Sequence, residues 1–210
     1  HKNFIVCLVP KIDTATGRVA EAEAVVRYHH KDLGIVDPGR YINLLEETKL
    51  SHYLDLYVFE EVCKTLHRWE LAGIPLIPIA VNFAGATLKQ ESIAEKMLHL
   101  IEKYHVRCEY LAVEVSESGN DMNQEMLAET SGKIRKANVR VILDHFGAKD
   151  SSFSILSLME FDGLKLDKSL ITNIVGNARS RIVAQAVIDI CRQLGAFVQA
   201  SGVETQDQLN

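Results

Sequence analysis

Acidic and amide side chains recur at the ends of short apolar stretches along this chain of 210 residues. Five side chains stand in or beside such positions: Glu23, Asn82, Glu114, Asp144 and Lys165. Taken singly, a carboxylate at a strand end is most often a helix cap or part of a surface salt bridge. Three carboxylates at one mouth would repel one another without a cation, and an all-oxygen set suits Mg²⁺ or Mn²⁺. Because the lysine could supply part of that charge, the spacing leaves a metal site and an ion-pair network equally open.

Strand and helix patterns alternate along most of the chain. Apolar residues recur at helical spacing over 54–69, 93–104 and 183–194. Short apolar stretches flank these helices: IAVN (79–82), LAVEVSE (111–117), VRVILD (139–144), LKLD (164–167) and FVQAS (197–201). Their polar ends follow one another at intervals of 23 to 34 residues. This is the spacing of βα units and predicts a parallel sheet covered by helices.

The first 28 residues have a different pattern. Residues 3–9 and 19–28 are apolar-rich and are joined by the turn sequence DTATG, which predicts an antiparallel hairpin. The later strands are too apolar to have a wet face, and each ends in a polar residue. That is typical of a (β/α)₈ barrel, whose catalytic groups converge on the C-terminal face. A doubly wound open sheet is the alternative, but no GxGxxG or P-loop pattern supports it.

We therefore predict one barrel domain over residues 1–210. Because a full barrel takes roughly 250 residues, we expect the last strand and helix to be absent from this chain. The start at His1 instead of Met indicates a fragment of a larger multidomain protein. Four cysteines without a CxxC pair are interpreted as buried, reduced thiols of a cytoplasmic protein.

The net charge of −5 argues against a general electrostatic grip on a nucleic acid polymer or an anionic membrane, although a local basic pocket stays open. No apolar run approaches the roughly 18 residues that span a bilayer. We therefore expect no membrane contact by this segment, whereas the parent protein could be anchored elsewhere.

Several motifs, in order, carry a family resemblance. They are GRVAEAEAVVRYHH (17–30), DLGIVDPGRYINLLEETKL (32–50), VNFAG (81–85), LAVEVSES (111–118), LDHFG (143–147), LKLDKSL (164–170) and ASGVET (200–205). With them the chain resembles the EAL domains. These are phosphodiesterases that linearise the bacterial second messenger cyclic di-GMP on a (β/α)₈ barrel with an antiparallel first strand. Val25 stands where the Glu-Ala-Leu signature has its leucine.

The resemblance implies a role for each matching residue. The residues that match metal ligands are Glu23, Asn82, Glu114 and Asp144. Lys165 matches the lysine that helps to orient or activate the attacking water. Arg27 matches an arginine that faces cyclic di-GMP, and Glu117 matches a glutamate that steadies the loop after Asp144.

The departures from the family pattern fall at the site itself. His145 stands where active members have a second Asp, and the loop Gly-Thr-Gly-Tyr is replaced by residues 147–150, Gly-Ala-Lys-Asp. Ser201 stands where the motif AEGVE has its first Glu. Val9 replaces a Gln that reaches a guanine base in family members.

The charges of the remaining side chains indicate how many metal ions this site could hold. Two divalent cations bring +4, which an intact family site opposes with five carboxylates, whereas Glu23, Glu114 and Asp144 supply −3. Lys165 reduces that charge to −2, which one divalent ion balances. His145 could ligate a softer metal, but a neutral imidazole cannot replace a bridging carboxylate, and a packed or solvated histidine is the commoner case. We interpret the stretch as a former two-metal site with a vestigial Lys165 and at most one Mg²⁺ or Mn²⁺.

Three functions follow, in order of preference. The first is a non-hydrolytic EAL module that binds cyclic di-GMP weakly and reports it to attached or partner signalling domains; Arg27 supports it and Val9 weakens it. The second is an interaction domain without ligand, which contacts a protein partner or a second copy of itself. The third is a weakly active, metal-dependent cyclic di-GMP phosphodiesterase.

Overall fold

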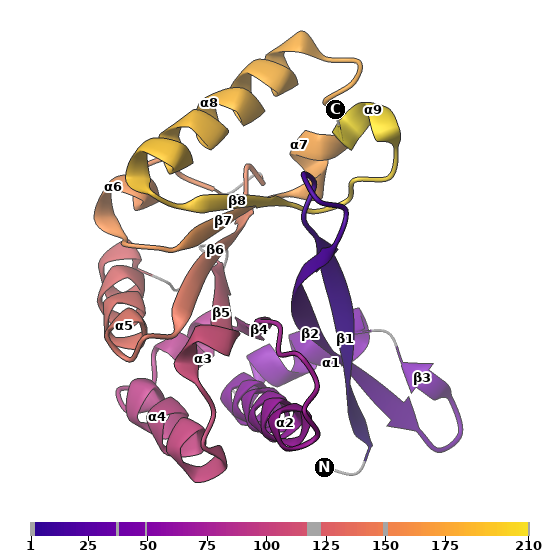
Figure 1. The fold of residues 1–210 in the computed structure, drawn as a ribbon, viewed down its shortest axis with the longest axis vertical. Coiled ribbons are helices and arrows are strands. Elements are labelled where there is room, and N and C mark those ends of the chain that lie inside the picture. The colour runs from indigo at the N-terminus through magenta and orange to yellow at the C-terminus, as the bar shows by residue number, and fades with distance from the viewer. Residues whose placement is uncertain (1–2, 37, 49, 117–122, 149–150, 210) are drawn as a thin grey trace. The chain divides into compact units, whose positions relative to one another are not determined.

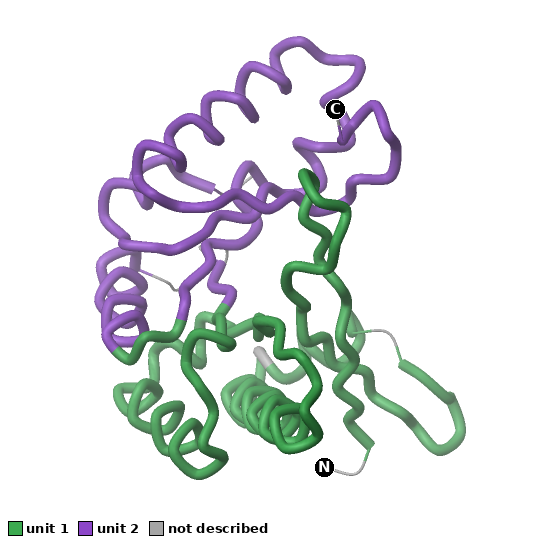
Figure 2. The backbone as a smooth tube through the Cα atoms, viewed as in Figure 1, with its two compact units in different colours: residues 1–113, 137–139 green, residues 114–136, 140–210 purple. Residues whose placement is uncertain are grey.

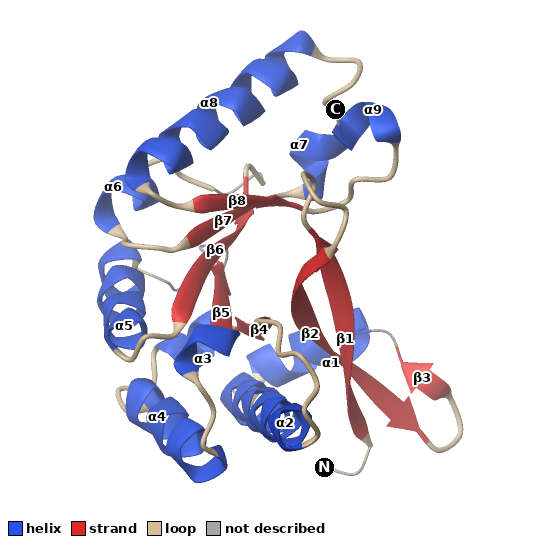
Figure 3. Ribbon diagram, viewed as in Figure 1, coloured by secondary structure: helices blue, strands red, loops and turns tan. Residues whose placement is uncertain are grey.

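The computed structural model describes residues 3–36, 38–48, 50–116, 123–148 and 151–209 (Figure 1). The chain divides into two compact units (Figure 2). Unit 1 comprises residues 1–113 and 137–139, and unit 2 comprises residues 114–136 and 140–210. Strands and helices alternate along the chain in both units, as the sequence pattern predicts (Figure 3).

Unit 1 begins with the antiparallel hairpin expected from the sequence. Its strands are β1 (Phe4–Ile12), β2 (Val19–His30), β3 (Gly34–Val36), β4 (Ile79–Phe83) and the start of β5 (Leu111–Ser116). The strand order is β1-β2-β4-β5, and the short β3, which the sequence analysis missed, pairs with the far end of β2. In the hairpin, Val9 lies opposite Glu23 and Ile5 lies opposite Arg27. β4 runs parallel to β2, as predicted, with Ala80 beside Glu23.

The helices of unit 1 cover this sheet. They are α1 (Pro38–Glu47), α2 (Ser51–Leu71), α3 (Gly85–Leu88) and α4 (Ile93–Tyr104), followed by a 3₁₀ turn at Cys108–Tyr110. The helical spacing over 54–69 and 93–104 is confirmed. α2 buries Val58, Val62 and Leu66 at that spacing, and α4 buries Met97 and Ile101. Apolar burial of this kind, more than helix propensity, stabilises helices in folded domains.

Unit 2 continues the parallel sheet in the order β5-β6-β7-β8. Its further strands are β6 (Arg140–Phe146), β7 (Gly163–Leu166) and β8 (Phe197–Ala200). β6 pairs in parallel with β7, and β7 pairs in parallel with β8, with Lys165 beside Gln199. The prediction of parallel strands at 139–144, 164–167 and 197–201 is therefore confirmed.

The helices of unit 2 are α5 (Gln124–Lys136), α6 (Ile155–Leu158), α7 (Lys168–Thr172), α8 (Ala178–Leu194) and α9 (Gln206–Leu209). The helix over 183–194 is confirmed. Its buried face differs in part from the apolar stripe in the sequence, which consists of Val183, Ala186, Val187, Ile190 and Leu194. α8 buries Ala184, Val187 and Cys191, whereas Val183 and Leu194 are exposed. Among the described residues, no helix is long and apolar enough to cross a membrane.

The four cysteines differ from the prediction of uniformly buried thiols. Cys63 and Cys191 are buried, but Cys108 is half-buried and Cys7 is exposed, so the prediction is wrong for these two. Cys7 lies on β1 between the exposed residues Ile5 and Val9. Among the strands that the structure describes, β1 has β2 alone as its neighbour in the strand order. Burial raises the pKa of the Cys63 thiol to about 12, which keeps it uncharged.

The close packing of β7 against β8 gives a test of this part of the fold. A Cβ atom added at Gly163 would lie 2.3 Å from Cε2 of Phe197, the residue opposite it on β8. We expect Gly163→Ala to lower the free energy of unfolding by about 1–3 kcal/mol, because it overpacks the strand pair. Gly132 is the control, since nothing lies within 4 Å of an added Cβ there. Gly132→Ala, within α5, should raise stability by up to about 1 kcal/mol. Equal effects of both changes in urea unfolding would contradict this packing.

Candidate functional site

In unit 1 the structure brings together two of the predicted ligands, Glu23 and Asn82. They lie on the neighbouring parallel strands β2 and β4, and Asn82 Nδ2 donates a hydrogen bond of 2.8 Å to Glu23 Oε1. Glu23 is half-buried and Asn82 is exposed. Because the amino group of an amide cannot ligate a cation, Asn82 offers a metal its carbonyl oxygen alone.

Arg27 and Val9 share this part of the unit. Arg27 follows Glu23 by four residues, so the alternation of a strand places both side chains on one face. The guanidinium is half-buried, and its Nη1 donates to the Val26 carbonyl at 2.9 Å. Val9, opposite Glu23 on β1, is 45% exposed. The cross-strand neighbour of Glu23 is therefore an exposed, apolar side chain. That Val9 replaces an amide of family members stays a prediction.

A further ion pair on the same face was missed by the sequence analysis. Glu21 is buried, and Lys11 Nζ lies 2.8 Å from its Oε1. The alternation in VAEAEAVV could have shown that Glu21 and Glu23 face the same way. The pairing with Lys11 depends on the hairpin register, which composition does not reveal. This lysine supplies a positive charge beside the acidic residues of unit 1.

In unit 2 the structure brings together Glu114, Asp144 and Lys165, from β5, β6 and β7. All three are buried, with exposures of 1%, 6% and 8%. Lys165 Nζ lies 2.8 Å from Glu114 Oε2 and 3.4 Å from Asp144 Oδ2. The ammonium group therefore lies against both carboxylates and leaves a net charge of −1 among the three side chains.

His145 bonds to the same carboxylate. Its backbone N–H donates to Asp144 Oδ1 at 2.6 Å, and its ring Nδ1 lies 3.3 Å from Asp144 Oδ2. Its φ of 57° is in the left-handed region, which is uncommon for a residue with a side chain and often marks a functional position. The imidazole is 55% exposed, in agreement with a solvated histidine. Both oxygens of Asp144 thus face donors of the protein itself.

The segment after Lys165 is fixed by a helix cap. Asp167 is the N-cap of α7, where its carboxylate accepts from the backbone N–H of Ser169 at 2.8 Å. Burial alone would raise the pKa of Asp167, but the hydrogen bonds from Ser169 and the nearby His145 and Lys168 lower it overall. A charged Asp167 therefore stabilises the turn that follows the lysine.

Two other predicted positions belong to unit 2, Ser201 and Glu117. Ser201 follows β8, is half-buried, and donates its backbone N–H to the Leu166 carbonyl at 3.0 Å. It therefore lies at the end of the strand beside Lys165. Glu117 lies outside the described residues, as do Lys149 and Asp150 of the altered loop.

The donor sets can be compared with the metals that the sequence pattern suggests. The part of the chain that the structure describes contains no group of three or more His, Cys, Asp or Glu side chains placed to hold a metal ion. In unit 2, Lys165 bonds the two carboxylates, and His145 brings no negative charge. These residues do not fit a pair of divalent cations. The convergence of the residues of unit 1 with those of unit 2 at one mouth stays a prediction.

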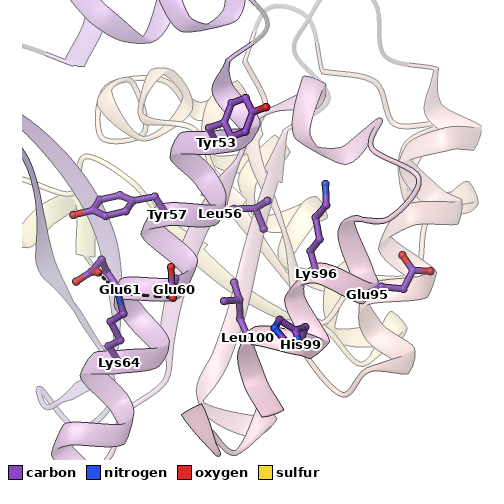
Figure 4. A pocket seen from close by; sticks show the side chains of 10 residues that line it. All are labelled: Tyr53, Leu56, Tyr57, Glu60, Glu61, Lys64, Glu95, Lys96, His99 and Leu100. Carbon is purple, nitrogen blue, oxygen red and sulfur yellow. Dashed lines mark hydrogen bonds and ion pairs between the residues drawn. The ribbon is translucent and has the colours of Figure 1, made fainter. Parts of the chain in front are cut away.

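A separate cavity of about 820 Å³ lies between α2 and α4 of unit 1 (Figure 4). Its lining residues are Tyr53, Leu56, Tyr57, Glu60, Glu61, Lys64, Glu95, Lys96, His99 and Leu100. Glu60 ties the two helices together, since its Oε1 accepts from Lys103 Nζ at 2.8 Å and from Tyr104 Oη at 2.6 Å. The residues predicted for the site are not among the lining residues, so the cavity is distinct from that constellation.

The family model of the EAL domain matches residues 1–210, the whole chain. The chain belongs to the EAL domain family. The resemblance inferred from the ordered motifs is therefore confirmed.

Two curated relatives come from Pseudomonas aeruginosa. The chain is 32% identical over 200 residues to the cyclic di-GMP phosphodiesterase NbdA, covering 95% of this EAL chain and 26% of the relative. It is 30% identical over 207 residues to the cyclic di-GMP phosphodiesterase PA2567, covering 99% of this chain and 35% of the relative. The EAL chain thus spans about a quarter to a third of the length of these relatives.

Solved structures show the same fold. The chain matches the PaMucR phosphodiesterase in its cyclic di-GMP complex with a TM-score of 0.90 and 23% identity. The match covers 99% of this chain and 84% of that one. The predicted α/β fold of barrel type, with its first strand antiparallel to the second, is therefore confirmed.

The contact of Lys165 with two buried carboxylates can be tested through stability. Lys165→Met keeps the length of the side chain but leaves Glu114 and Asp144 without their cation, so we expect a loss of about 3–5 kcal/mol in urea unfolding. Lys136→Met is the control, because Lys136 is exposed, and a surface change of this kind stays within about 0.5 kcal/mol. If Lys165→Met unfolds at the same urea concentration as the control, the ammonium does not hold this cluster together.

Proposed function

We propose that this EAL domain binds cyclic di-GMP weakly and does not hydrolyse it at the rate of an ordinary enzyme, so that it acts as a receptor module. The observation that carries the proposal is the side chain at position 145, where an imidazole and not a carboxylate lies 3.3 Å from Asp144 Oδ2. Glu114 and Asp144 share the Lys165 ammonium without that further carboxylate.

The charges around Asp144 support the loss of hydrolysis. A two-metal site stabilises the attacking and the leaving oxygens together, and the imidazole of His145, which carries no negative charge, cannot replace a carboxylate that bridges two such ions. Losing about 4 kcal/mol of transition-state stabilisation slows a reaction roughly a thousandfold. Cyclic di-GMP would then persist on the protein, which is what a receptor requires.

A single hard cation is still compatible with the donor types. We propose that the residues that would hold Mg²⁺ or Mn²⁺ are among Glu23 and Asn82 of unit 1 and Glu114 and Asp144 of unit 2, as their match to the family implies. When bound, such an ion polarises a phosphate oxygen of the ligand. Lys165 competes with it for Glu114 and Asp144, so cation binding should be weak.

Arg27 and Val9 set the expected affinity for cyclic di-GMP. A guanidinium offers a fixed fork of donors to a phosphate or a guanine edge, and these charge-assisted contacts do not need a metal. Val9 offers no hydrogen bond, and leaving a guanine edge unpaired costs roughly 1–3 kcal/mol. The receptor would therefore act at high ligand concentration, through attached or partner signalling domains or a second copy of the chain, in the cytoplasm.

An interaction domain without ligand is the second candidate, and the exposed Val9 favours it. Calorimetric titration with cyclic di-GMP separates the two. We expect weak binding by the wild type, none by Arg27→Ala, and 5- to 150-fold tighter binding by Val9→Gln, from the same 1–3 kcal/mol. Val19→Gln and Arg18→Ala are matched controls, since Val19 is 46% exposed and Arg18 is exposed.

The receptor proposal fails if the wild type gives no heat of binding at high micromolar ligand and Val9→Gln changes nothing. The interaction-domain function would then take its place. Binding that is unaffected by Arg27→Ala would instead remove Arg27 from the ligand contacts.

Restoring the missing carboxylates tests the assignment of hydrolysis. We expect His145→Asp combined with Ser201→Glu to raise the affinity for Mn²⁺ before it raises the rate, because the altered loop at 147–150 remains. Asp also tolerates the left-handed backbone of this position. Mn²⁺ titration and chromatographic detection of the linear product measure the two effects. Wild-type turnover near 10 per second, a typical enzymatic rate, would refute the non-hydrolytic assignment.

A further inference from the structure

A part-buried polar contact in unit 1 joins α2 to the segment that directly follows β4. Asp55 Oδ2 accepts a hydrogen bond from the Ala84 backbone N–H at 2.8 Å and another from Thr87 Oγ1 at 2.5 Å. Thr87 is completely buried, so its hydroxyl requires a partner within the protein. We call the contact of Asp55 with Ala84 and Thr87 the Asp55 clamp.

The Asp55 clamp supplies the side-chain acceptor that the first turn of α3 lacks. Ala84 is the N-cap of α3, and its methyl group cannot cap the helix. In a capping box, the side chain of the third helical residue accepts from the N–H of the N-cap residue. Here Thr87 holds that third position, and Asp55 of α2 accepts from Ala84 in its place. The geometry of this turn is therefore set by a residue 29 positions earlier in the chain.

The same helix also grips the end of β4 through an apolar contact. Phe59 lies four residues after Asp55, so both lie on one side of α2. Its ring packs edge-on against the ring of Phe83, with centroids 5.9 Å apart. The two residues that follow Asn82 are therefore held by α2, Phe83 through its ring and Ala84 through its N–H. Asn82 is the last residue before these contacts.

We propose that Asp55 is a positioning residue for Asn82. By fixing the backbone directly after Asn82, the Asp55 clamp keeps the Asn82 amide in the orientation in which Nδ2 bonds Glu23 Oε1 at 2.8 Å. The amide carbonyl then points consistently toward whatever the domain binds. Without the clamp, the strand end and the amide become mobile while the remainder of β4 stays paired with β2.

The side-chain amide signal of Asn82 tests this proposal without any ligand. In a ¹⁵N–¹H correlation spectrum, the pair of signals from Nδ2 is assigned by its loss in Asn82→Ala. We expect Asp55→Ala to shift or broaden this pair, because the bond to Glu23 loses its fixed geometry. Asp55→Asn should restore the wild-type position, since an amide oxygen can accept both hydrogen bonds of the clamp.

Asp162 provides a matched control in unit 2. Its Oδ2 accepts from the Val141 backbone N–H at 2.8 Å, the same kind of bond as that of Asp55 with Ala84. Asp162→Ala should leave the Asn82 signals unchanged. If Asp55→Ala moves the backbone signals of Ala84 and Thr87 but not the Asn82 pair, Asp55 is only a helix cap and the proposal is overturned. Should Asp55→Ala not fold, Thr87→Val, which removes one bond of the clamp, must move the Asn82 pair, and no movement overturns the proposal equally.

A second readout rests on the proposed function. If the domain binds cyclic di-GMP, we expect Asp55→Ala to weaken binding about tenfold and Asp55→Asn to retain it, which corresponds to about 1.4 kcal/mol. Unchanged affinity in Asp55→Ala would show that the position of Asn82 does not matter for the ligand. If the wild type does not bind cyclic di-GMP, the receptor function fails, whereas the Asn82 signals still decide the role of Asp55.

Discussion

The ion pairs of Lys165 with Glu114 and Asp144 are the interaction on which the account of unit 2 depends. Three ionisable side chains are buried at the ends of neighbouring parallel strands, and a buried charge without a partner is strongly destabilising. The lysine satisfies this requirement from within the chain. The cluster is therefore stable as a structural element whether or not it binds a metal ion.

In unit 1 the two predicted ligands, Glu23 and Asn82, are joined by a hydrogen bond and not by an ion pair. Glu23 is only half-buried and shares a hydrogen bond with the neutral Asn82, whereas the buried Glu21 takes the ion pair with Lys11. Glu23 and Asn82, which are more exposed than Glu21, are therefore the groups of this unit that a ligand can reach. The orientation of Asn82 in turn depends on α2, which grips the end of β4 through Asp55 and Phe59. Helix packing and site geometry are therefore coupled in this unit.

Much of the fold could be predicted from the sequence, because strand patterns and their spacing report local burial. The hairpin, the parallel strands and the three long helices follow from apolar periodicity. The buried face of α8 was misjudged, since an apolar stripe does not reveal which side of the helix is covered in three dimensions. Likewise, the exposure of Cys7 depends on which strands pair. The strand β3, Gly34–Val36, has only three residues, which is too few to show an alternation of apolar and polar side chains.

Part of the site was also accessible from the sequence, and part was not. Glu23 with Asn82, and Glu114 with Asp144 and Lys165, are brought together in their respective units as the strand ends suggested. The neighbours of these residues were missed. The hairpin register determines that Lys11 pairs with Glu21. Asp55 contacts the backbone N–H of Ala84, 29 residues later, and the pattern of side chains in the sequence does not reveal such a contact. The left-handed backbone of His145, which aims its N–H at Asp144, is also a property of the fold.

The central claim is that protein groups, and not a metal pair, satisfy the carboxylates of this EAL domain. Titration of the wild-type domain with Mn²⁺ in the presence of cyclic di-GMP, followed by the electron paramagnetic resonance signal of the free ion, counts the bound ions directly. We expect no more than one ion per chain, with weak affinity, since Lys165 occupies oxygens of Glu114 and Asp144. Two tightly bound ions per chain would contradict the account.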